Sequence, residues 1–222
     1  MIAIKALSHR VLEIPDLLIP PGRVAVIGPN GGGKTTLLRL LAGIDLPERG
    51  EILIDGLSPR SREVGWVGEH PEQNIVFSRV SDEIASPLRF RHDPCSLVDE
   101  RVKAFAGDLG IGALLGRETG GLSTGQKVMV ALGAALISTP DILVLDETDS
   151  NLDQEITMVV EGLIGAASHS HVLQATQRME LAARSDHILF LEGGWVLLSG
   201  TPAAVFKALS GTAFSLPPGG FR

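Results

Sequence analysis

The chain has 222 residues, enough for one large domain with a sizeable apolar interior. Its 19 Lys and Arg against 26 Asp and Glu give a formal net charge of −7, which disfavours broad electrostatic attraction to nucleic acid or anionic lipid. The single cysteine, Cys95, excludes an internal disulfide and a thiolate zinc site, and no apolar run approaches the ~18–20 residues that a membrane-spanning helix needs. We therefore expect no nucleic-acid partner, and any membrane role must depend on another protein.

In chain order, short apolar runs bounded by turn residues predict strands on both sides of a Gly-rich loop. Before the loop, strands are expected at residues 2–7, 17–19 and 24–27, and a helix over 36–42 follows it until Gly43. Later strands are expected at residues 51–56, 64–67, 142–145, 172–175, 187–191 and 195–198. Strands that alternate with helices around such a loop predict an α/β fold with a mainly parallel sheet.

The strand pattern disappears between about residues 73 and 137, where polar segments broken by Gly and Pro favour helices at 81–85 and 97–109. We interpret this region as a helical subdomain inserted into the core. The predicted organisation is a single domain over 1–222. Its parts are a core at about 1–72 and 138–210, the helical subdomain at about 73–137, and a mobile tail at about 211–222 whose end is rich in Pro and Gly.

The Gly-rich loop, residues 28–36, is Gly-Pro-Asn-Gly-Gly-Gly-Lys-Thr-Thr and fits the phosphate-loop pattern G-x-x-x-x-G-K-[ST]. Glycines let backbone N–H groups converge on a polyphosphate, Lys34 adds a charge for the β- and γ-phosphates, and Thr35 offers a hydroxyl to Mg²⁺. The flanking strand and helix disfavour a chance match. We expect an exposed Lys34 ammonium that contributes little packing. The candidate nucleotide-binding residues here are Asn30, Gly31, Gly32, Gly33, Lys34, Thr35 and Thr36.

A second pattern is the apolar strand 142–145 followed directly by Asp146 and Glu147, which places two carboxylates at the carboxyl end of a strand. Asp146 is a candidate ligand of Mg²⁺ through water. Glu147 is a candidate general base for the water that attacks the γ-phosphate. Alone, the pattern is equally typical of a strand that ends in solvated acids, but the phosphate loop favours the functional interpretation.

A third pattern is the segment 122–126, Leu-Ser-Thr-Gly-Gln, which opens the apolar stretch 128–137. Its structural interpretation is a capping box, in which Ser123 and Gln126 satisfy the N-terminus of a helix. The functional interpretation uses the same geometry, because such an N-terminus presents N–H groups and a serine hydroxyl to an anion. Ser123, Gly125 and Gln126 are therefore candidate nucleotide-binding residues.

Taken together, these patterns resemble the ATP-binding subunits of ATP-binding-cassette (ABC) transporters over about residues 4–206. The segments that match are the phosphate loop, the signature-like segment 122–126, the strand with its acids at 142–147, the D-loop-like segment 150–153, and the ending 200–206. The D-loop match is also typical of an ordinary helix start. The resemblance implies a phosphate-loop NTPase core with a mainly parallel sheet, additional antiparallel strands and the helical subdomain.

The resemblance also implies ATP and Mg²⁺ as cofactors. The implied partners are a second ABC ATPase subunit, identical or different, that stacks head to tail, and a transmembrane transporter subunit. The implied location is cytoplasmic, peripheral on the inner face of the cell membrane. The segment 64–76 resembles energy-coupling-factor and cobalt-type importers, which usually have Val-Gly-x-Val-Phe-Gln-Asn-Pro-Asp-Asp-Gln there. These features predict an ATP hydrolase that powers the transport of a small solute, with a vitamin or a transition-metal ion as options.

The alternative function is a soluble ABC ATPase with an assembly or regulatory role and no membrane partner. The apolar residues 75–77 are expected to be exposed, and they are interpreted either as a docking groove for a membrane partner or as core packing of the helical subdomain. The sequence leaves open the solute, the direction of transport and the choice between homodimer and heterodimer.

The chain departs from the family pattern at functional positions. Glu69 stands where the family has a glutamine that touches Mg²⁺, and Gln177 stands where a histidine usually follows Thr176. Thr124 replaces the usual glycine of the signature, and Thr148-Asp149 replaces Pro-Thr before the D-loop. We therefore expect an active ATPase that is weakened or asymmetric. Its candidate catalytic residues are Lys34, Glu147 and Gln177, and its candidate metal ligands are Thr35, Asp146 and Glu69.

The residue that stacks on adenine is a further departure. The family usually has an aromatic residue for this purpose upstream of the phosphate loop, but His9 and Arg10 occupy that neighbourhood and the chain has no tyrosine. His9 is interpreted either as the stacking residue or as a solvated loop histidine.

Overall fold

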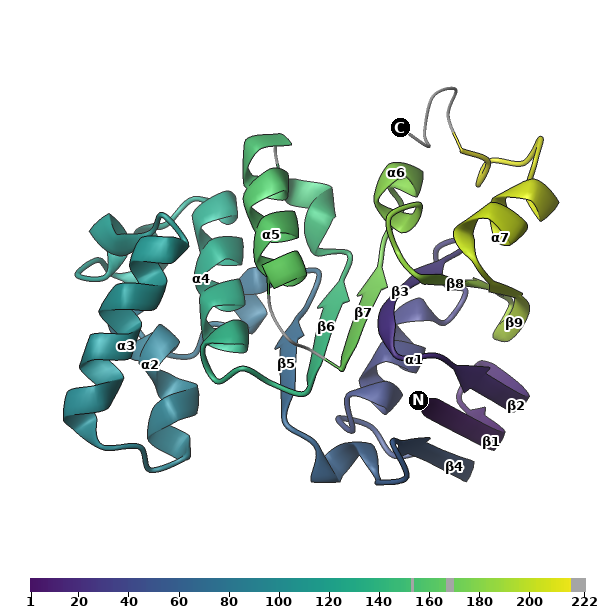
Figure 1. Cartoon of the computed structure of the whole chain (residues 1–222), viewed down its shortest axis with the longest axis horizontal. Helices are drawn as coiled ribbons and strands as arrows, with labels where there is room; N and C mark the ends of the chain where they lie inside the picture. The colour runs from purple at the N-terminus through teal and green to yellow at the C-terminus, as the bar shows by residue number, and fades with distance from the viewer. Residues whose placement is uncertain (153, 167–169, 217–222) are drawn as a thin grey trace. The chain divides into compact units, whose positions relative to one another are not determined.

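The computed structural model describes residues 1–152, 154–166 and 170–216, and the chain divides into two compact units. The first unit comprises Met1–Glu63 and Ser170–Arg222 and contains the phosphate loop, so we call it the phosphate-loop unit. The second, Val64–His169, contains most of the helices, and we call it the helical unit. Figure 1 shows the elements of both units.

One sheet of the phosphate-loop unit is antiparallel and has the order β2-β1-β4, with β1 at Ile2–His9, β2 at Leu12–Ile19 and β4 at Arg49–Ile54. Alternate residues of β1 are buried, because successive side chains of a strand point to opposite faces. The strands expected at 2–7 and 17–19 are confirmed, and both are longer than predicted. As a result, β1 and β2 are joined by a tight two-residue turn, with His9 paired to Leu12.

The other strands of this unit are β7 (His171–Ala175), β3 (Gly22–Ile27), β8 (His187–Glu192) and β9 (Trp195–Gly200), in that order. β3 is parallel to β7 and β8, whereas β9 is antiparallel to β8. Residues 24–27 of β3 are all buried, as expected for a parallel strand covered on both faces. In Figure 1, α6 (Met179–Ala182) and α7 (Pro202–Ala208) cover one face and α1 (Lys34–Leu41) lies on the other.

The apolar cluster under α6 and α7 includes Ile27, Ile188, Phe190, Val205 and Phe206. Phe214 and Leu216, from the tail predicted at 211–222, pack against this cluster. The rest of that tail, residues 217–222, lies outside the described residues. The cluster fixes the sheet from which the phosphate loop emerges.

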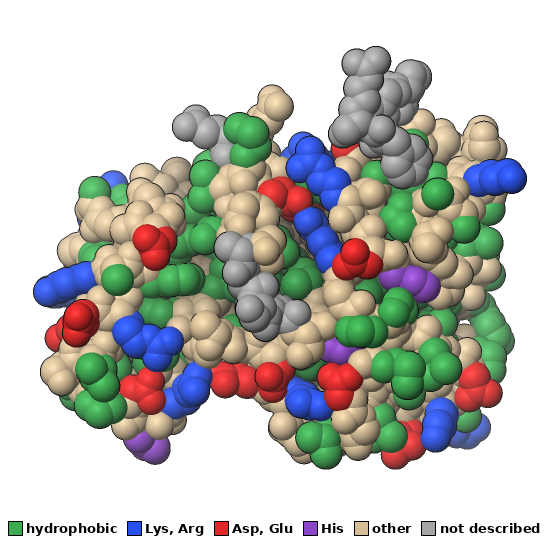
Figure 2. Space-filling model, viewed as in Figure 1, with side chains coloured by type: hydrophobic (Ala, Val, Ile, Leu, Met, Phe, Trp, Pro, Cys, Tyr) green, Lys and Arg blue, Asp and Glu red, His purple; other side chains and the backbone are tan. Residues whose placement is uncertain are grey.

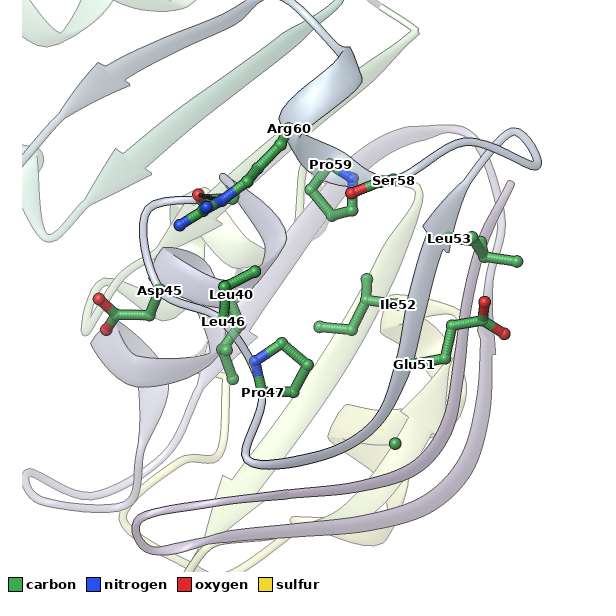
Figure 3. A pocket seen from close by; sticks show the side chains of 12 residues that line it. Leu40, Asp45, Leu46, Pro47, Glu51, Ile52, Leu53, Ser58, Pro59 and Arg60 are labelled. Carbon is green, nitrogen blue, oxygen red and sulfur yellow. Dashed lines mark hydrogen bonds between the residues drawn. The ribbon is translucent and has the colours of Figure 1, made fainter.

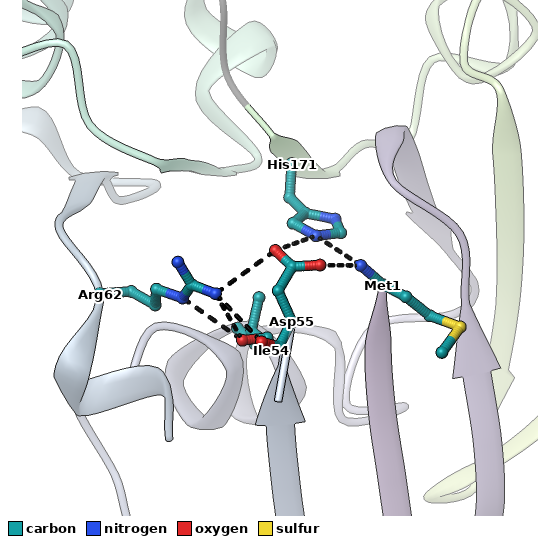
Figure 4. Close-up of polar contacts among 5 residues, drawn as sticks. All are labelled: Met1, Ile54, Asp55, Arg62 and His171. Carbon is teal, nitrogen blue, oxygen red and sulfur yellow. Dashed lines mark hydrogen bonds and ion pairs between the residues drawn. The ribbon is translucent and has the colours of Figure 1, made fainter. Parts of the chain in front are cut away.

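A polar cluster joins the two sheets of the phosphate-loop unit (Figure 4). The Asp55 carboxylate accepts a hydrogen bond from the Met1 amino group, and its other oxygen lies 3.5 Å from His171 Nε2 and 3.6 Å from Arg62 Nη2. The amino group lowers the pKa of Asp55, and burial lowers the pKa of His171. Because Met1 precedes β1, Asp55 follows β4 and His171 begins β7, these contacts hold the starts and ends of three strands together.

The helical unit contains the parallel pair β5 (Val64–Val67) and β6 (Ile142–Asp146). Its helices are α2 (Val80–Phe90), α3 (Cys95–Asp108), α4 (Thr124–Ile137) and α5 (Gln154–Ala166), and α2 packs on both α3 and α4 (Figure 1). Short 3₁₀ turns occupy Pro71–Gln73, Gly112–Leu114, Thr119–Gly121 and Thr148–Asn151, and the phosphate-loop unit has one more at Pro59–Ser61. The helix expected at 81–85 lies within α2, and the helix expected at 97–109 matches α3 except at its last residue, which follows the end of α3.

Acidic and basic side chains are interspersed on the face shown in Figure 2, with hydrophobic side chains between them. Within the described ranges, none of the helices combines the length and the apolar character that crossing a bilayer requires.

Candidate functional site

The phosphate loop leaves β3 and enters α1 in the phosphate-loop unit. Gly28 has φ +144°, and a Cβ atom there would lie 1.9 Å from the carbonyl oxygen of Leu191, so only glycine fits between the loop and β8. Further along, the Gly32 N–H donates to the Pro29 carbonyl over 3.1 Å. The loop is therefore a compact turn held against the end of β8.

The N-terminus of α1 is open to an anion. No side chain caps it and its first turn contains no acidic residue. Thr35 is exposed and Thr36 is half-buried. The first N–H groups of a helix have no partner within the helix and carry partial positive charge, so they bind phosphate oxygens well. This geometry fits the phosphate site that the sequence predicts.

Lys34 lies inside the loop. Its side chain is only 5% exposed, and Nζ donates to the carbonyl oxygens of Gly28 at 3.1 Å and Pro29 at 3.2 Å. The expectation of an exposed ammonium with little packing was therefore wrong, because the loop wraps around its own lysine. The loop carbonyls hold the positive charge at the centre of the candidate phosphate site.

Gln177 reaches the phosphate loop from the end of β7. Its Nε2 donates to Asn30 Oδ1 over 2.7 Å, and both side chains are exposed. The preceding residue, Thr176, is buried and donates its N–H to the Val26 carbonyl over 3.3 Å. The sequence indicated both Asn30 and Gln177 as site residues, but not this contact between positions 147 residues apart.

The helical unit contains the two candidate carboxylates. Asp146 is the last residue of β6 and is buried, whereas Glu147 is half-buried. Glu147 has a left-handed backbone, with φ 50° and ψ 29°. This conformation is uncommon for a residue other than glycine and often occurs at functional sites. The turn therefore gives the two neighbouring carboxylates different environments.

The capping box at the start of α4 is confirmed. Ser123 Oγ accepts from the Gln126 N–H at 3.3 Å, and the Ser123 N–H donates to Gln126 Oε1 at 3.1 Å. A serine hydroxyl that accepts a hydrogen bond still has its own proton to donate, and Ser123 is exposed. The capping box and the functional interpretation are therefore compatible, because capping leaves the hydroxyl proton of Ser123 to donate.

The loop between β5 and α2 contains Glu69, which is exposed. The Gly68 N–H donates to Asn74 Oδ1 over 2.9 Å and closes this loop. Beyond it, the buried Glu83 carboxylate accepts from the N–H groups of Val76 at 2.8 Å and Phe77 at 2.7 Å. Of the three apolar residues 75–77 that were expected to be exposed, Val76 is 81% exposed, whereas Ile75 and Phe77 are half-buried.

His9 fits neither of its two interpretations. It is the last residue of β1, it is buried, and its Nδ1 lies 3.5 Å from Glu48 Oε1. The expectation of a loop residue was wrong because β1 extends to His9. Arg10 donates its backbone N–H to the same Glu48 oxygen at 3.3 Å. His9 is therefore unavailable for stacking on a base.

A separate hollow of about 210 Å³ lies at the opposite end of α1 (Figure 3). Since α1 rises ~12 Å over its length, this hollow is not the phosphate-loop end. Arg60 Nε donates to the Gly43 carbonyl over 3.0 Å at its edge. Its lining contains none of the predicted site residues and consists of Leu40, Gly43, Asp45, Leu46, Pro47, Gly50, Glu51, Ile52, Leu53, Ser58, Pro59 and Arg60.

The protein family described as ABC transporter matches residues 15–150, which is more than half of the chain. The matched segment includes the phosphate loop, the capping box of α4 and both candidate carboxylates. The chain belongs to the ABC transporter family. The resemblance inferred from the three motifs is confirmed.

Relatives of this ABC chain cover most of its length. An energy-coupling factor transporter ATP-binding protein of Halalkalibacterium halodurans is 35% identical over 207 residues, which are 88% of this chain and 74% of that protein. The nickel import ATP-binding protein NikO of Rhodobacter capsulatus is 36% identical over 211 residues, which are 86% of this chain and 83% of that protein.

The fold is similar to that of cbiO1 from Clostridium perfringens, described as part of the ABC transporter complex cbiONQ. The TM-score is 0.80 at 25% sequence identity, and the similarity covers 93% of this ABC chain and 90% of that one. The predicted fold class, an α/β ABC ATPase, is therefore confirmed.

Proposed function

We propose that this ABC chain is the ATP-binding and ATP-hydrolysing subunit that powers transport of a small solute through a separate membrane protein. The observation that carries the proposal is the phosphate loop. It encloses the Lys34 ammonium and leads into the N-terminus of α1, which no side chain caps. The relatives named as an energy-coupling factor subunit and a nickel import subunit favour transport over a soluble assembly or regulatory role. The nickel import subunit supports a transition-metal ion as the solute, and a vitamin is the alternative.

In this proposal the triphosphate of ATP binds the N–H groups of residues 30–36 and the ammonium of Lys34. Mg²⁺ typically takes one or two protein oxygens and completes its shell with phosphates and water. The exposed Thr35 hydroxyl and the Asp146 carboxylate are suitable oxygen donors, and Glu69 is the third candidate ligand. When bound, the ion would neutralise charge that develops on the phosphates.

Glu147 orients or deprotonates the attacking water, and the Gln177 amide donates a hydrogen bond to the γ-phosphate. Ser123, Gly125 and Gln126 bind the nucleotide held by a second ABC subunit, identical or different, which stacks head to tail. The chain acts at the cytoplasmic face of the membrane as a peripheral subunit of a transmembrane protein.

Changing Gln177→His should raise ATP turnover by roughly tenfold, or ~1.4 kcal/mol of barrier. Gln177 already lies against the loop, where its side chain contacts Asn30. Its amide can donate a hydrogen bond but cannot transfer a proton, because an amide does not titrate near neutral pH. A histidine both donates and titrates near neutral pH. Steady-state hydrolysis by the complete transporter complex measures the effect, with ATP affinity expected to change little. A flat or lower turnover would show that Gln177 does not replace the family's histidine in function or serves a site that works differently.

The partner can be tested at two exposed apolar residues of the helical unit, Val76 and Phe90. Both side chains are strongly exposed, and Phe77 supports Phe90 with ring centroids 6.5 Å apart. The chain should co-purify from membranes with an integral membrane protein, and Val76→Asp should reduce recovery of that protein by roughly tenfold, because an interface centre does not tolerate an unpaired charge. ATP binding should not change.

The matched control is Leu97→Asp, which places the same charge at another exposed apolar position of the helical unit, on α3. It should not affect recovery. If no integral membrane protein co-purifies and the chain hydrolyses ATP fully without membranes, the soluble alternative replaces the transport proposal.

A further inference from the structure

Trp195 lies at the same edge of the sheet as the phosphate loop. β8 runs parallel to β3, so both strands end at the same edge. After Glu192 the chain turns through Gly193 and Gly194 into β9, and Trp195 pairs with Glu192 as its first residue. The Trp195 side chain is 49% exposed, although a large aromatic ring gains most from burial.

Gly194 fixes this turn against the phosphate loop. Its N–H donates to the Gly32 carbonyl over 3.2 Å, and its carbonyl accepts from the Glu13 N–H over 3.0 Å. A Cβ atom on Gly194 would lie 1.7 Å from the Val11 carbonyl oxygen, so only glycine allows this approach. Trp195 therefore follows a residue that bridges the phosphate loop and the β1–β2 hairpin.

Val11 is the neighbouring exposed apolar residue, at the tip of the β1–β2 hairpin and 54% exposed. The next side chain, Leu12, is buried directly against Gly33, where an added Cβ would lie 2.7 Å from Leu12 Cδ2. The preceding residue, Arg10, is held elsewhere, by Glu48 and by Asp45 at 3.9 Å. Val11 therefore lies beside the phosphate loop, and the side chain of Arg10, the other residue of the turn, is directed toward Asp45.

The other phenylalanine rings described in this unit are buried or half-buried against its core. Phe190 and Phe206 are buried, and Phe214 packs against Phe190 with centroids 5.2 Å apart. The chain has no tyrosine. Among the Phe and Trp residues described in the phosphate-loop unit, Trp195 is therefore the exposed one, with ring surface available to a ligand.

We propose that Trp195, together with Val11, receives the base of the bound nucleotide. This inference rests on the proposed ATP-binding function. The phosphates occupy the loop, and the base, at the other end of the ribose, extends to the neighbouring surface that Gly194 fixes in place. The indole stacks on the planar base and the Val11 methyl groups contact its edge. Because every base has a π-face, such a surface strengthens binding of purine nucleotides without distinguishing adenine from guanine.

The first test uses tryptophan fluorescence. The chain has two tryptophans, so the Trp66→Phe variant leaves Trp195 as its sole indole. Titration of this variant with Mg-ATP should quench its fluorescence. Titration with Mg-tripolyphosphate, which has the phosphate chain but no base, should not. Quenching of equal size by both ligands would overturn the proposal, since it would reflect the loop and not the base.

The second test measures affinity by calorimetry. Trp195→Ala should weaken ATP and GTP binding about tenfold and leave tripolyphosphate binding within about twofold, whereas Trp195→Phe should retain most of the affinity. The matched control is Leu197→Ala, two residues along the same strand and 54% exposed, which should change neither ligand. Thermal melting in the absence of ligand checks that each variant folds.

The outcomes separate this inference from the function on which it rests. If ATP affinity is unchanged in Trp195→Ala, or if ATP and tripolyphosphate weaken equally, the base does not bind Trp195 and the phosphate-loop assignment stands. If the unmodified chain binds neither ligand, the ATP-binding function fails and this inference fails with it.

Discussion

Lys34→Ala is expected to lower the affinity for ATP by about a hundredfold or more. Hydrogen bonds to charged groups contribute about 1.5–3 kcal/mol each, and the ammonium would contact two phosphates, so the summed loss exceeds the ~2.7 kcal/mol of a hundredfold change. Calorimetric titration with Mg-ATP measures the change. Because Nζ already lies among the loop carbonyls, the charge is in place before the nucleotide arrives.

Because Lys34 is buried, its substitution can lower the stability of the loop as well as the affinity for ATP, and a control must separate the two effects. Removing Nζ leaves the Gly28 and Pro29 carbonyls without that donor, and an unsatisfied buried acceptor costs about 1–3 kcal/mol. Lys34→Gln keeps a neutral donor and loses the charge. It should melt closer to the unmodified chain than Lys34→Ala does, yet still bind ATP poorly. Native ATP affinity in both variants would contradict the phosphate-loop assignment.

The buried parallel strands were predictable because a continuous apolar run indicates such a strand. Residues 24–27 and 142–145 are continuous apolar runs, and both are fully buried strands parallel to a neighbour. The capping box of α4 was predictable as well, since Ser123 and Gln126 are three residues apart and interact within one helical turn. Such features need only the residues that form them.

The missed features depend on parts of the chain that are distant in sequence. His9 was assigned to a loop, but pairing with both β2 and β4 extends β1 toward the hairpin turn. The contact between Gln177 and Asn30 requires β7 and β3 to lie side by side, which no local pattern reveals. In both cases the packing of distant strands, not residue type, decides where the side chain lies. Lys34 is a local exception, because its direction depends on how residues 28–34 fold around Nζ, and the phosphate-loop pattern does not specify that conformation.

Glu147→Gln should slow ATP hydrolysis by at least about a hundredfold while ATP stays bound, because a positioned general base contributes ~10²–10⁴-fold. The glutamine has nearly the same size, so it can keep the half-buried position and the left-handed backbone of Glu147 at similar cost. It can still contact water but cannot accept its proton. Phosphate release assays measure hydrolysis, and equilibrium titration measures binding.

The same variant should reveal the second subunit. If hydrolysis is what separates two ABC subunits that share bound ATP, a chain that binds but does not hydrolyse should accumulate as a dimer in the presence of Mg-ATP. Static light scattering then reports a doubled mass with ATP and the monomer mass with ADP. Asp146→Asn is the informative comparison, because the neighbouring carboxylate is assigned to Mg²⁺ and its loss should weaken nucleotide binding as well as hydrolysis. If Glu147→Gln hydrolyses ATP at the rate of the unmodified chain, another residue is the general base. The left-handed backbone at Glu147 would then need a different explanation.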